Sequence, residues 1–205
     1  MNRKNLLKDI AETGYNVGFG AKKHFASYDI ATKLPSLIAL MTMAVGIFGL
    51  IYPTLSLPAV SATVLLLGLI AKDVNSYQKV SEKYEQAGVQ LTTIRDELRA
   101  IYRTVDCLAD GEDLSKLIER YTKLRNDAKA IGFSKHLLFS DWYAHYKFFW
   151  QDQVEWIDEQ LKFRFWRDKV PLSLMAFLAL IVVGTLGLAV YLSAIDILFA
   201  RVCTP

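Results

Sequence analysis

An uncharged run, Leu34–Ala71, limits the folds available to this chain more than any other feature. It contains no Lys, Arg, Asp, Glu or His over 38 residues. A straight helix of that length would reach about 57 Å, nearly twice the ~30 Å hydrocarbon core of a bilayer. Pro53 and Pro58 interrupt the run near its middle, and they predict the end of one helix and the start of another. We therefore expect a helical hairpin of two membrane spans, the first over residues 35–52 and the second over residues 59–71.

A second uncharged run covers Val170–Ile195 and is long enough to span a bilayer alone, with some tilt. The alternative for both runs is a buried core helix, which is the rarer outcome for apolar runs of about 18 residues or more. Hydrophobic residues make up 53% of the chain and charged residues 22%, a mixture that fits separate apolar and charged blocks. The expected fold class is an all-α integral membrane protein with a two-span hairpin, long coiled-coil-like cytosolic helices and a third C-terminal span.

The charge distribution predicts the organisation and the topology. Residues 1–33 carry six Lys/Arg and three Asp/Glu, contain no secretory signal pattern, and precede a hairpin turn without charge. By the positive-inside rule, the N-terminus and residues 72–169 are cytosolic and the C-terminus lies outside. The expected parts are a cytosolic interfacial N-terminal segment (1–33), the transmembrane hairpin (34–71), a cytosolic helical region (72–169), a third transmembrane helix (170–199) and an extracytosolic tail (200–205).

The N-terminal segment contains small residues at helical spacing. Three glycines in this stretch argue for a loop, but Gly14, Gly18 and Ala21 at i, i+4 and i+7 would form a groove that another helix can approach closely. We favour a helix at the membrane surface, because aromatic rings and lysines are typical of the headgroup region. The residues expected there are Tyr15, Phe19, Lys22, Lys23, Phe25 and Tyr28. His24 is a lone histidine, and we expect a surface or headgroup contact rather than a metal ligand.

The cytosolic region begins with the clearest periodicity in the chain. Its apolar residues alternate in steps of three and four: Tyr77, Val80, Tyr84, Ala87, Leu91, Ile94, Leu98, Ile101 and Val105. This heptad seam predicts one helix from Lys72 to about Val105 that belongs to a coiled coil or bundle. Two partners remain open: the next two helices of the same chain, or further copies of the chain.

Two more helices are expected before the third span. Asp110 or Asp113 is placed to cap a helix that ends at Gly132. Ser140 is placed to cap a longer helix over Asp141–Asp168, which holds all four tryptophans. Its last rings fit an aromatic belt at the start of the third span: Phe163, Phe165 and Trp166.

The sequence contains no recognisable catalytic motif. There is no phosphate-binding glycine loop, paired-cysteine motif or nucleophile elbow, and His136 and His145 lack a metal spacing. The carboxylates are expected to be solvated on mixed-charge helical faces. We predict no catalytic, cofactor-binding or metal-binding residues, no cofactor and no enzyme activity. The 17 basic and 17 acidic residues of segment 72–169 also argue against nucleic-acid binding.

The two cysteines are expected on opposite sides of the membrane and therefore unable to pair within one chain. Cys107 would be an inert cytosolic thiol, and Cys203 a tail residue able to cross-link subunits.

One family shares these features. The residues that carry the likeness are Tyr15-Asn16, Ala21-Lys22-Lys23-His24-Phe25, Tyr28-Asp29, Leu34-Pro35 before the hairpin, and Lys72-Asp73 after it. Over roughly residues 5–110 the chain resembles the SLATT effectors of bacterial conflict systems, which are associated with nucleotide-generating and nucleotide-sensing domains. Its third span departs from the minimal two-span pattern of that family, which leaves open which helices would line a pore.

The resemblance implies a function. It suggests a homo-oligomer in the lipid of the bacterial inner membrane that forms a pore or disrupts the membrane in antiviral defence. The trigger would be a nucleotide-generating or nucleotide-sensing partner protein. The alternative is a non-conducting membrane scaffold or sensor that anchors a partner through its cytosolic helices.

Overall fold

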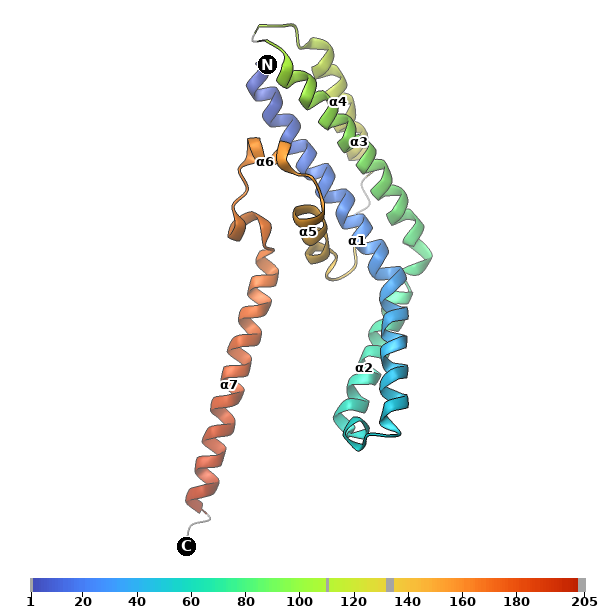
Figure 1. Cartoon of the computed structure of the whole chain (residues 1–205), viewed down its shortest axis with the longest axis vertical. Helices are drawn as coiled ribbons and strands as arrows, with labels where there is room; N and C mark the ends of the chain where they lie inside the picture. Colours follow the sequence, from blue (N-terminus) through green and yellow to red (C-terminus); the bar gives the residue numbers. More distant parts are fainter. Residues whose placement is uncertain (1, 110, 132–134, 203–205) are drawn as a thin grey trace. The chain divides into compact units, whose positions relative to one another are not determined.

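The computed structural model describes residues 2–109, 111–131 and 135–202, without the side chains of residues 188 and 192–202. Its elements are α1 (Arg3–Gly49), η1 (Pro53–Ser56), α2 (Pro58–Asn75), η2 (Gln78–Val80), α3 (Ser81–Cys107), α4 (Ser115–Ala130), α5 (Ser140–Gln151), α6 (Glu155–Leu161), the π-helical turn η3 (Phe165–Lys169) and α7 (Leu172–Val202). Every regular element within the described ranges is helical, as the sequence predicts (Figure 1). Asp110, Gly132 and Cys203 lie outside the described residues.

The chain divides into two compact units, Met1–Lys162 and Phe163–Pro205. The first unit contains α1 to α6. The second contains η3 and α7, an apolar helix whose described side chains are largely exposed. Phe165 and Trp166 at its start are also exposed, and their rings lie edge to face with centroids 5.3 Å apart.

Helix α1 is the axis of the first unit. It runs without a break for 47 residues, about 70 Å at 1.5 Å per residue, and includes Pro35. Asn2 caps its start by accepting a hydrogen bond from the backbone N–H of Asn5 at 2.9 Å. The boundary expected between an interfacial segment and a first span, at residues 33 and 34, is therefore not a boundary between elements. One helix carries both the charged and the uncharged sequence.

The core of the first unit lies along the charged part of α1. Helix α3 packs antiparallel to it, since Arg3 of α1 donates to the carbonyl oxygen of Val105 at 2.9 Å and Ala31 lies with Tyr84 in one buried cluster. The seam residues buried in this core are Tyr84, Ala87, Leu91, Ile94, Leu98, Ile101 and Val105. The seam is thus covered within the chain. Its main partner is α1, rather than the two helices that follow it or a second copy.

Two helices that the periodicity predicts as continuous are interrupted. The helix expected over Lys72–Val105 breaks between α2 and α3, where Ser76 donates its hydroxyl to the carbonyl oxygen of Asp73 at 2.6 Å. The helix expected over Asp141–Asp168 is divided into α5, α6 and η3. It breaks at Asp152, which has an extended backbone, and at Lys162, which has a φ of 52°. Apolar spacing is compatible with a continuous helix but does not detect such breaks.

The starts of α4 and α5 differ in their caps. Asp113 accepts hydrogen bonds from both the backbone N–H and the hydroxyl of Ser115, at 3.0 and 2.6 Å, but the N-cap position of α4 is Leu114, so Asp113 is not the N-cap residue that the sequence predicts. Ser140 does not cap α5. It is the first residue of the helix, and Phe139 precedes it with a φ of 66°.

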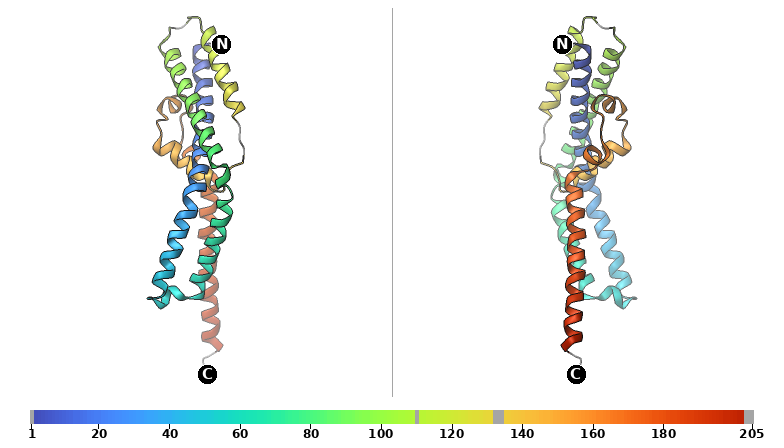
Figure 2. Two further views of the ribbon diagram at one scale, coloured as in Figure 1. Left: turned by 90° about the vertical axis from the view of Figure 1, so that its right-hand side faces the viewer. Right: turned by 90° about the vertical axis from the view of Figure 1, so that its left-hand side faces the viewer.

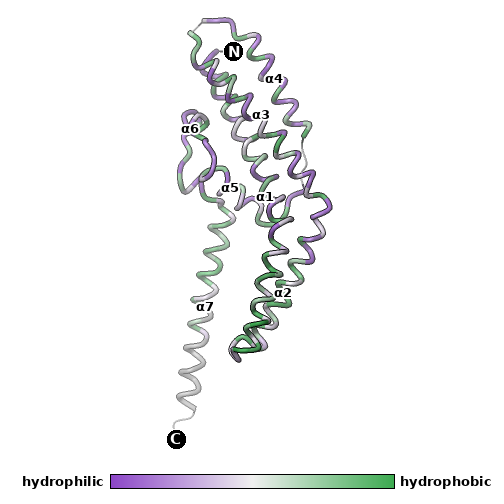
Figure 3. Tube along the Cα trace, turned by 45° about the vertical axis from the view of Figure 1, so that its right-hand side comes forward, coloured by the Kyte–Doolittle hydropathy of each residue, from purple (hydrophilic) through white to green (hydrophobic). Residues whose placement is uncertain are grey.

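The uncharged end of α1 and helix α2 lie side by side (Figures 1 and 2). Pro53 begins η1 and Pro58 begins α2, which is where the sequence predicts the turn. The hydroxyl of Ser56 closes the turn by donating to the carbonyl oxygen of Gly49 at 2.6 Å. Figure 3 shows this part of α1 and α2 as mostly hydrophobic, and α3 and α4 as mixed.

Three helical stretches are long and apolar enough to cross a membrane, in α1, in the helix that starts at Pro58, and in α7. The large apolar side chains that α1 and α2 expose there include Leu37, Leu40, Met41, Met43, Ile47, Phe48, Leu65, Leu66, Leu69 and Ile70. These side chains are not the core of this chain, so the alternative of a buried core helix does not describe the run.

Candidate functional site in the helical bundle

Short helix α5 is fastened to α1 by three ion pairs. Lys23 contacts Asp141 at the start of α5 at 2.7 Å, and Lys22 contacts Asp152 just after its end at 3.2 Å. Between them, Lys147 pairs with Asp29. Lys22 and Lys23, expected at the lipid headgroups, therefore hold α5 against α1. The rings expected beside them also point inward, as Tyr15 and Phe19 of α1 pack against Phe148 at centroid distances of 5.5 and 6.0 Å.

Two carboxylates expected to be solvated are enclosed in this arrangement. The side chain of Asp29 is 12% exposed and lies between Lys147 and Lys33. Burial raises the pKa of Asp29, but hydrogen bonds from the two lysines outweigh it, so the pKa lies below its ordinary value. Asp152 forms an ion pair with the buried Arg95 of α3 at 2.7 Å, in addition to its pair with Lys22 of α1. It thereby joins α1 and α3 to the connection between α5 and α6.

The small-residue groove predicted from Gly14 and Gly18 exists, and side chains of α3, α5 and α6 fill it. A Cβ atom on Gly14 would overlap the indole of Trp156 from α6. A Cβ atom on Gly18 would lie 2.9 Å from both the Arg95 side chain and the Phe148 ring. The glycines thus permit a close approach of α5, α6 and Arg95 to α1.

Two histidine rings, the buried His24 and the half-buried His136, lie against each other near the middle of α1. His24 is 4% exposed, and its ring lies 4.8 Å from the ring of His136, which precedes α5. His136 Nδ1 lies 3.2 Å from the hydroxyl of Ser27, and Tyr84 donates to the carbonyl oxygen of Lys135 at 2.6 Å. The surface or headgroup contact expected for His24 is therefore wrong. The single sequence offers no signal that pairs it with His136.

Burial sets the ionisation of both rings. It lowers the pKa of His136 to about 4, with smaller contributions from His24 and Lys23 that Asp141 partly opposes. Burial and then Lys23 also lower the pKa of His24. Both imidazoles are accordingly neutral at pH 7.

A cavity of about 600 Å³ opens between α1 and α4, within the size range of small-molecule sites. Its lining residues are Asp9, Glu12, Thr13, Asn16, Val17, Gly20, His24, Leu91, Tyr121, Arg125, Ala128 and Lys129. We call it the α1–α4 groove.

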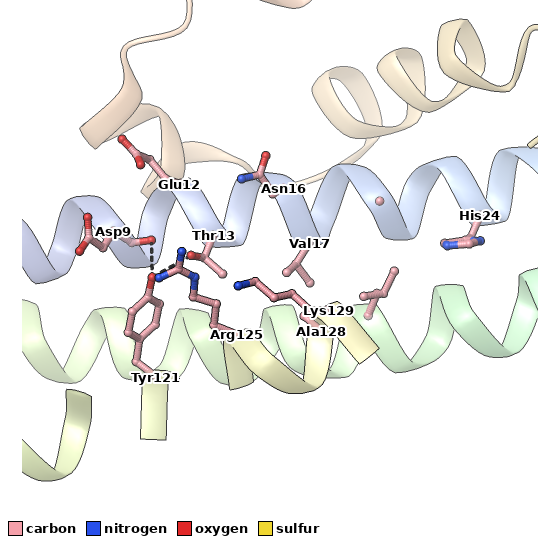
Figure 4. Close-up of a pocket in the computed structure, with 12 residues that line it drawn as sticks. Asp9, Glu12, Thr13, Asn16, Val17, His24, Tyr121, Arg125, Ala128 and Lys129 are labelled. Atoms are coloured by element: carbon pink, nitrogen blue, oxygen red, sulfur yellow. Dashed lines mark hydrogen bonds between the residues drawn. The ribbon is translucent and has the colours of Figure 1, made fainter. Parts of the chain in front are cut away.

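The α1–α4 groove combines both signs of charge. In Figure 4, Arg125 and Lys129 extend from α4 along α1, which contributes Asp9 and Glu12. The Tyr121 hydroxyl bridges the two helices, 2.9 Å from the hydroxyl of Thr13 and 3.3 Å from the carbonyl oxygen of Asp9. The groove therefore offers cationic donors and carboxylate acceptors to a polar ligand. Apolar periodicity did not single out the charged residues Asp9, Glu12, Arg125 and Lys129, since they lie off the buried faces.

No metal-binding cluster of three or more His, Cys, Asp or Glu occurs in the part of the chain that the structure describes. Cys107 lies exposed at the end of α3.

The family comparison covers most of the chain. Residues 1–178 match the family described as SMODS and SLOG-associating 2TM effector domain 6, which confirms the resemblance stated above. The matched region includes the whole first unit and the first residues of α7. No curated protein and no solved structure matches the chain. The extent of the family match is decisive: this chain belongs to the SLATT family of two-span membrane effectors.

Proposed function

We propose that the protein is a pore-forming or membrane-disrupting effector of a bacterial antiviral conflict system, triggered by a nucleotide-linked signal or a partner protein. The family description names an effector with two spans. The exposed apolar surface of α1 and α2 supports insertion in the inner membrane. In the proposed topology, the charged bundle of the first unit is cytosolic and the end of α7 lies outside.

The continuity of α1 is the observation that carries the proposal. The same helix forms the centre of the charged bundle and one arm of the apolar hairpin. A helix transmits displacement along its axis, so a movement of its cytosolic half would tilt its apolar half. The route through α2 and α3 changes from α-helix to a turn and a 3-10 helix over residues 76–80. We therefore take α1, rather than the helix expected over Lys72–Val105, as the lever that joins the cytosolic bundle to the hairpin.

The α1–α4 groove is where a signal would act on this lever. Helix α4 has fewer contacts with α1 than α3 or α5 has. The hydroxyl of Tyr121 hydrogen-bonds α4 to α1. A ligand or partner that binds Arg125 and Lys129 would change the position of α4 and thereby weaken or strengthen its contact with α1. Several copies would then separate their uncharged helices and admit water.

Conductance of purified protein in liposomes tests the proposal. Addition of candidate nucleotides or a partner protein should raise the conductance above that of untreated protein. A variant with four glycines inserted between Thr32 and Lys33 interrupts the lever and should abolish the response. The matched control carries the same insertion after Glu112, in the connection between α3 and α4, and should respond like the wild type.

Three outcomes would contradict the proposal: silence with and without every activator, an activated response in the lever-insertion variant, or purely monomeric protein on cross-linking. Viable cells on overexpression, with cross-links to another protein only, would instead support a non-conducting scaffold.

A further inference from the structure

Helix α5 exposes a row of aromatic rings on the side opposite its contact with α1. Tyr143, Tyr146 and Trp150 follow one another at steps of three and four, so they lie on one helical face. They are 36%, 51% and 63% exposed, respectively, and Phe139, just before the helix, is 52% exposed. The opposite face is fixed, because Ala144 and Phe148 are fully buried. We call the row Tyr143–Tyr146–Trp150 the α5 aromatic face.

The contacts of α5 show which way it is turned along α1. His145 packs against Phe19 of α1 at a centroid distance of 4.8 Å, on the side away from the uncharged run. Lys147, in contrast, pairs with Asp29, which also binds Lys33 at 2.5 Å. Since Lys33 is the last charged residue before the run, the Tyr143–Lys147 side of α5 is turned toward the apolar end of α1. The ammonium group of Lys147 lies 4.7 Å from the centre of the Tyr143 ring.

The distance along α1 from Asp29 to the start of the uncharged run matches the thickness of a headgroup layer. Asp29 precedes Leu34 by five residues, which is about 8 Å along a helix. The polar region on each side of a ~30 Å hydrocarbon core is about 5–8 Å thick. The Asp29–Lys147 pair therefore lies at headgroup level when the uncharged run occupies the hydrocarbon core.

We propose that α5 is an interfacial helix whose aromatic face lies in the headgroup–acyl boundary of the cytosolic leaflet. Tyrosine and tryptophan rings favour this layer, and Lys33, whose side chain is 73% exposed, is placed to meet lipid phosphates. The occupant is lipid because the face continues from the start of a membrane span, where the exposed Lys33 lies. This inference rests on the membrane insertion of α1 in the proposed function. It replaces the interfacial role expected for Tyr15 and Phe19.

Site-directed fluorescence tests the interfacial position of α5 separately from the membrane insertion of α1. In a background with Cys107→Ser and Cys203→Ser, an environment-sensitive probe is attached at Tyr143→Cys or Trp150→Cys. The protein is reconstituted in vesicles of phosphatidylethanolamine and phosphatidylglycerol that contain lipid with a nitroxide headgroup. Lys123→Cys on the exposed surface of α4 is the matched control, and Leu40→Cys, 64% exposed in the uncharged run, reports insertion.

We expect headgroup nitroxide to quench the two α5 probes at least threefold more than the Lys123 probe. Chain-labelled nitroxide should quench the Leu40 probe most. Equal quenching at α5 and Lys123, with strong quenching at Leu40, would overturn the interfacial role of α5 while leaving insertion intact. The same result with self-quenching between α5 probes would show that a second copy covers the face, and would also overturn the proposal. No quenching at Leu40 would overturn insertion and the inference together.

Discussion

His24 and His136 lie ring against ring in the core of the first unit, with centroids 4.8 Å apart, although one belongs to α1 and the other to the segment before α5. Lys23 and Asp141 flank the pair, Ser27 contacts His136, and the Tyr84 ring lies 6.2 Å from each imidazole. The two rings pack as neutral groups, so their protonation is coupled to the stability of the bundle.

Acidification should destabilise the bundle through this pair. Because the folded pKa of His136 is about 4 and the unfolded value is 6.5, the unfolded chain binds more protons between these pH values. The stability is fully present above pH 6.5 and is lost as the pH falls toward 4. We expect a loss of about 2 kcal/mol at pH 5 from His136, measured by denaturant unfolding in detergent. His136→Phe should flatten the pH dependence, and an unchanged profile would contradict the coupling.

Removal of the carboxylate at the α1–α5 contact should loosen α5. Asp29→Asn leaves Lys147 without its ionic partner, and we expect about 2 kcal/mol of destabilisation, since loss of one member of an enclosed ion pair is costly. Hydrogen exchange of the α5 amides should accelerate before that of α3. Glu12→Gln is the control, because the Glu12–Lys8 pair is exposed and 3.8 Å apart, and its loss should change stability by less than about 0.5 kcal/mol. Equal losses of stability in the two variants would show that the Asp29–Lys147 pair does not hold α5 against α1.

A side chain at Gly14 should displace α6. Gly14→Leu forces a branched side chain into the position of the Trp156 indole, and we expect about 2–3 kcal/mol of destabilisation from overpacking. Trp156 fluorescence should shift to longer wavelength in this variant. The double variant Gly14→Leu with Trp156→Ala should be less destabilised than the sum of the two single variants, because the cavity receives the leucine. Additive effects would show that the two residues do not share one space.

Thiol labelling should report the side of the membrane on which the bundle lies. Cys107 is exposed, so a membrane-impermeant maleimide should modify it in a Cys203→Ser background only after the inner membrane is opened. Labelling of intact spheroplasts would reverse the proposed topology. A Leu50→Cys variant, with the hairpin turn residue 89% exposed, should show the opposite pattern when Cys107 and Cys203 are both serine.

The sequence alone determined the uncharged runs, the turn between the first two apolar helices, the buried face of α3 and the family resemblance. Each uncharged run is long enough, as a helix, to cross the hydrocarbon core of a bilayer. Pro53 and Pro58 set the position of the turn in the first run. The heptad spacing of α3 identified the face that is buried. These features depend on nearest neighbours along the chain, so a single sequence reveals them.

Only the tertiary structure decided which surfaces meet. Periodicity shows that a face is apolar but not what covers it, and α1 covers the α3 seam. Lys22 and Lys23 have the composition of a headgroup contact, yet they pair with Asp152 and Asp141, which lie more than a hundred residues away. The same distance in sequence hid the partner of His24. Such contacts depend on the path of the whole chain, which brings α5 across the glycines of α1.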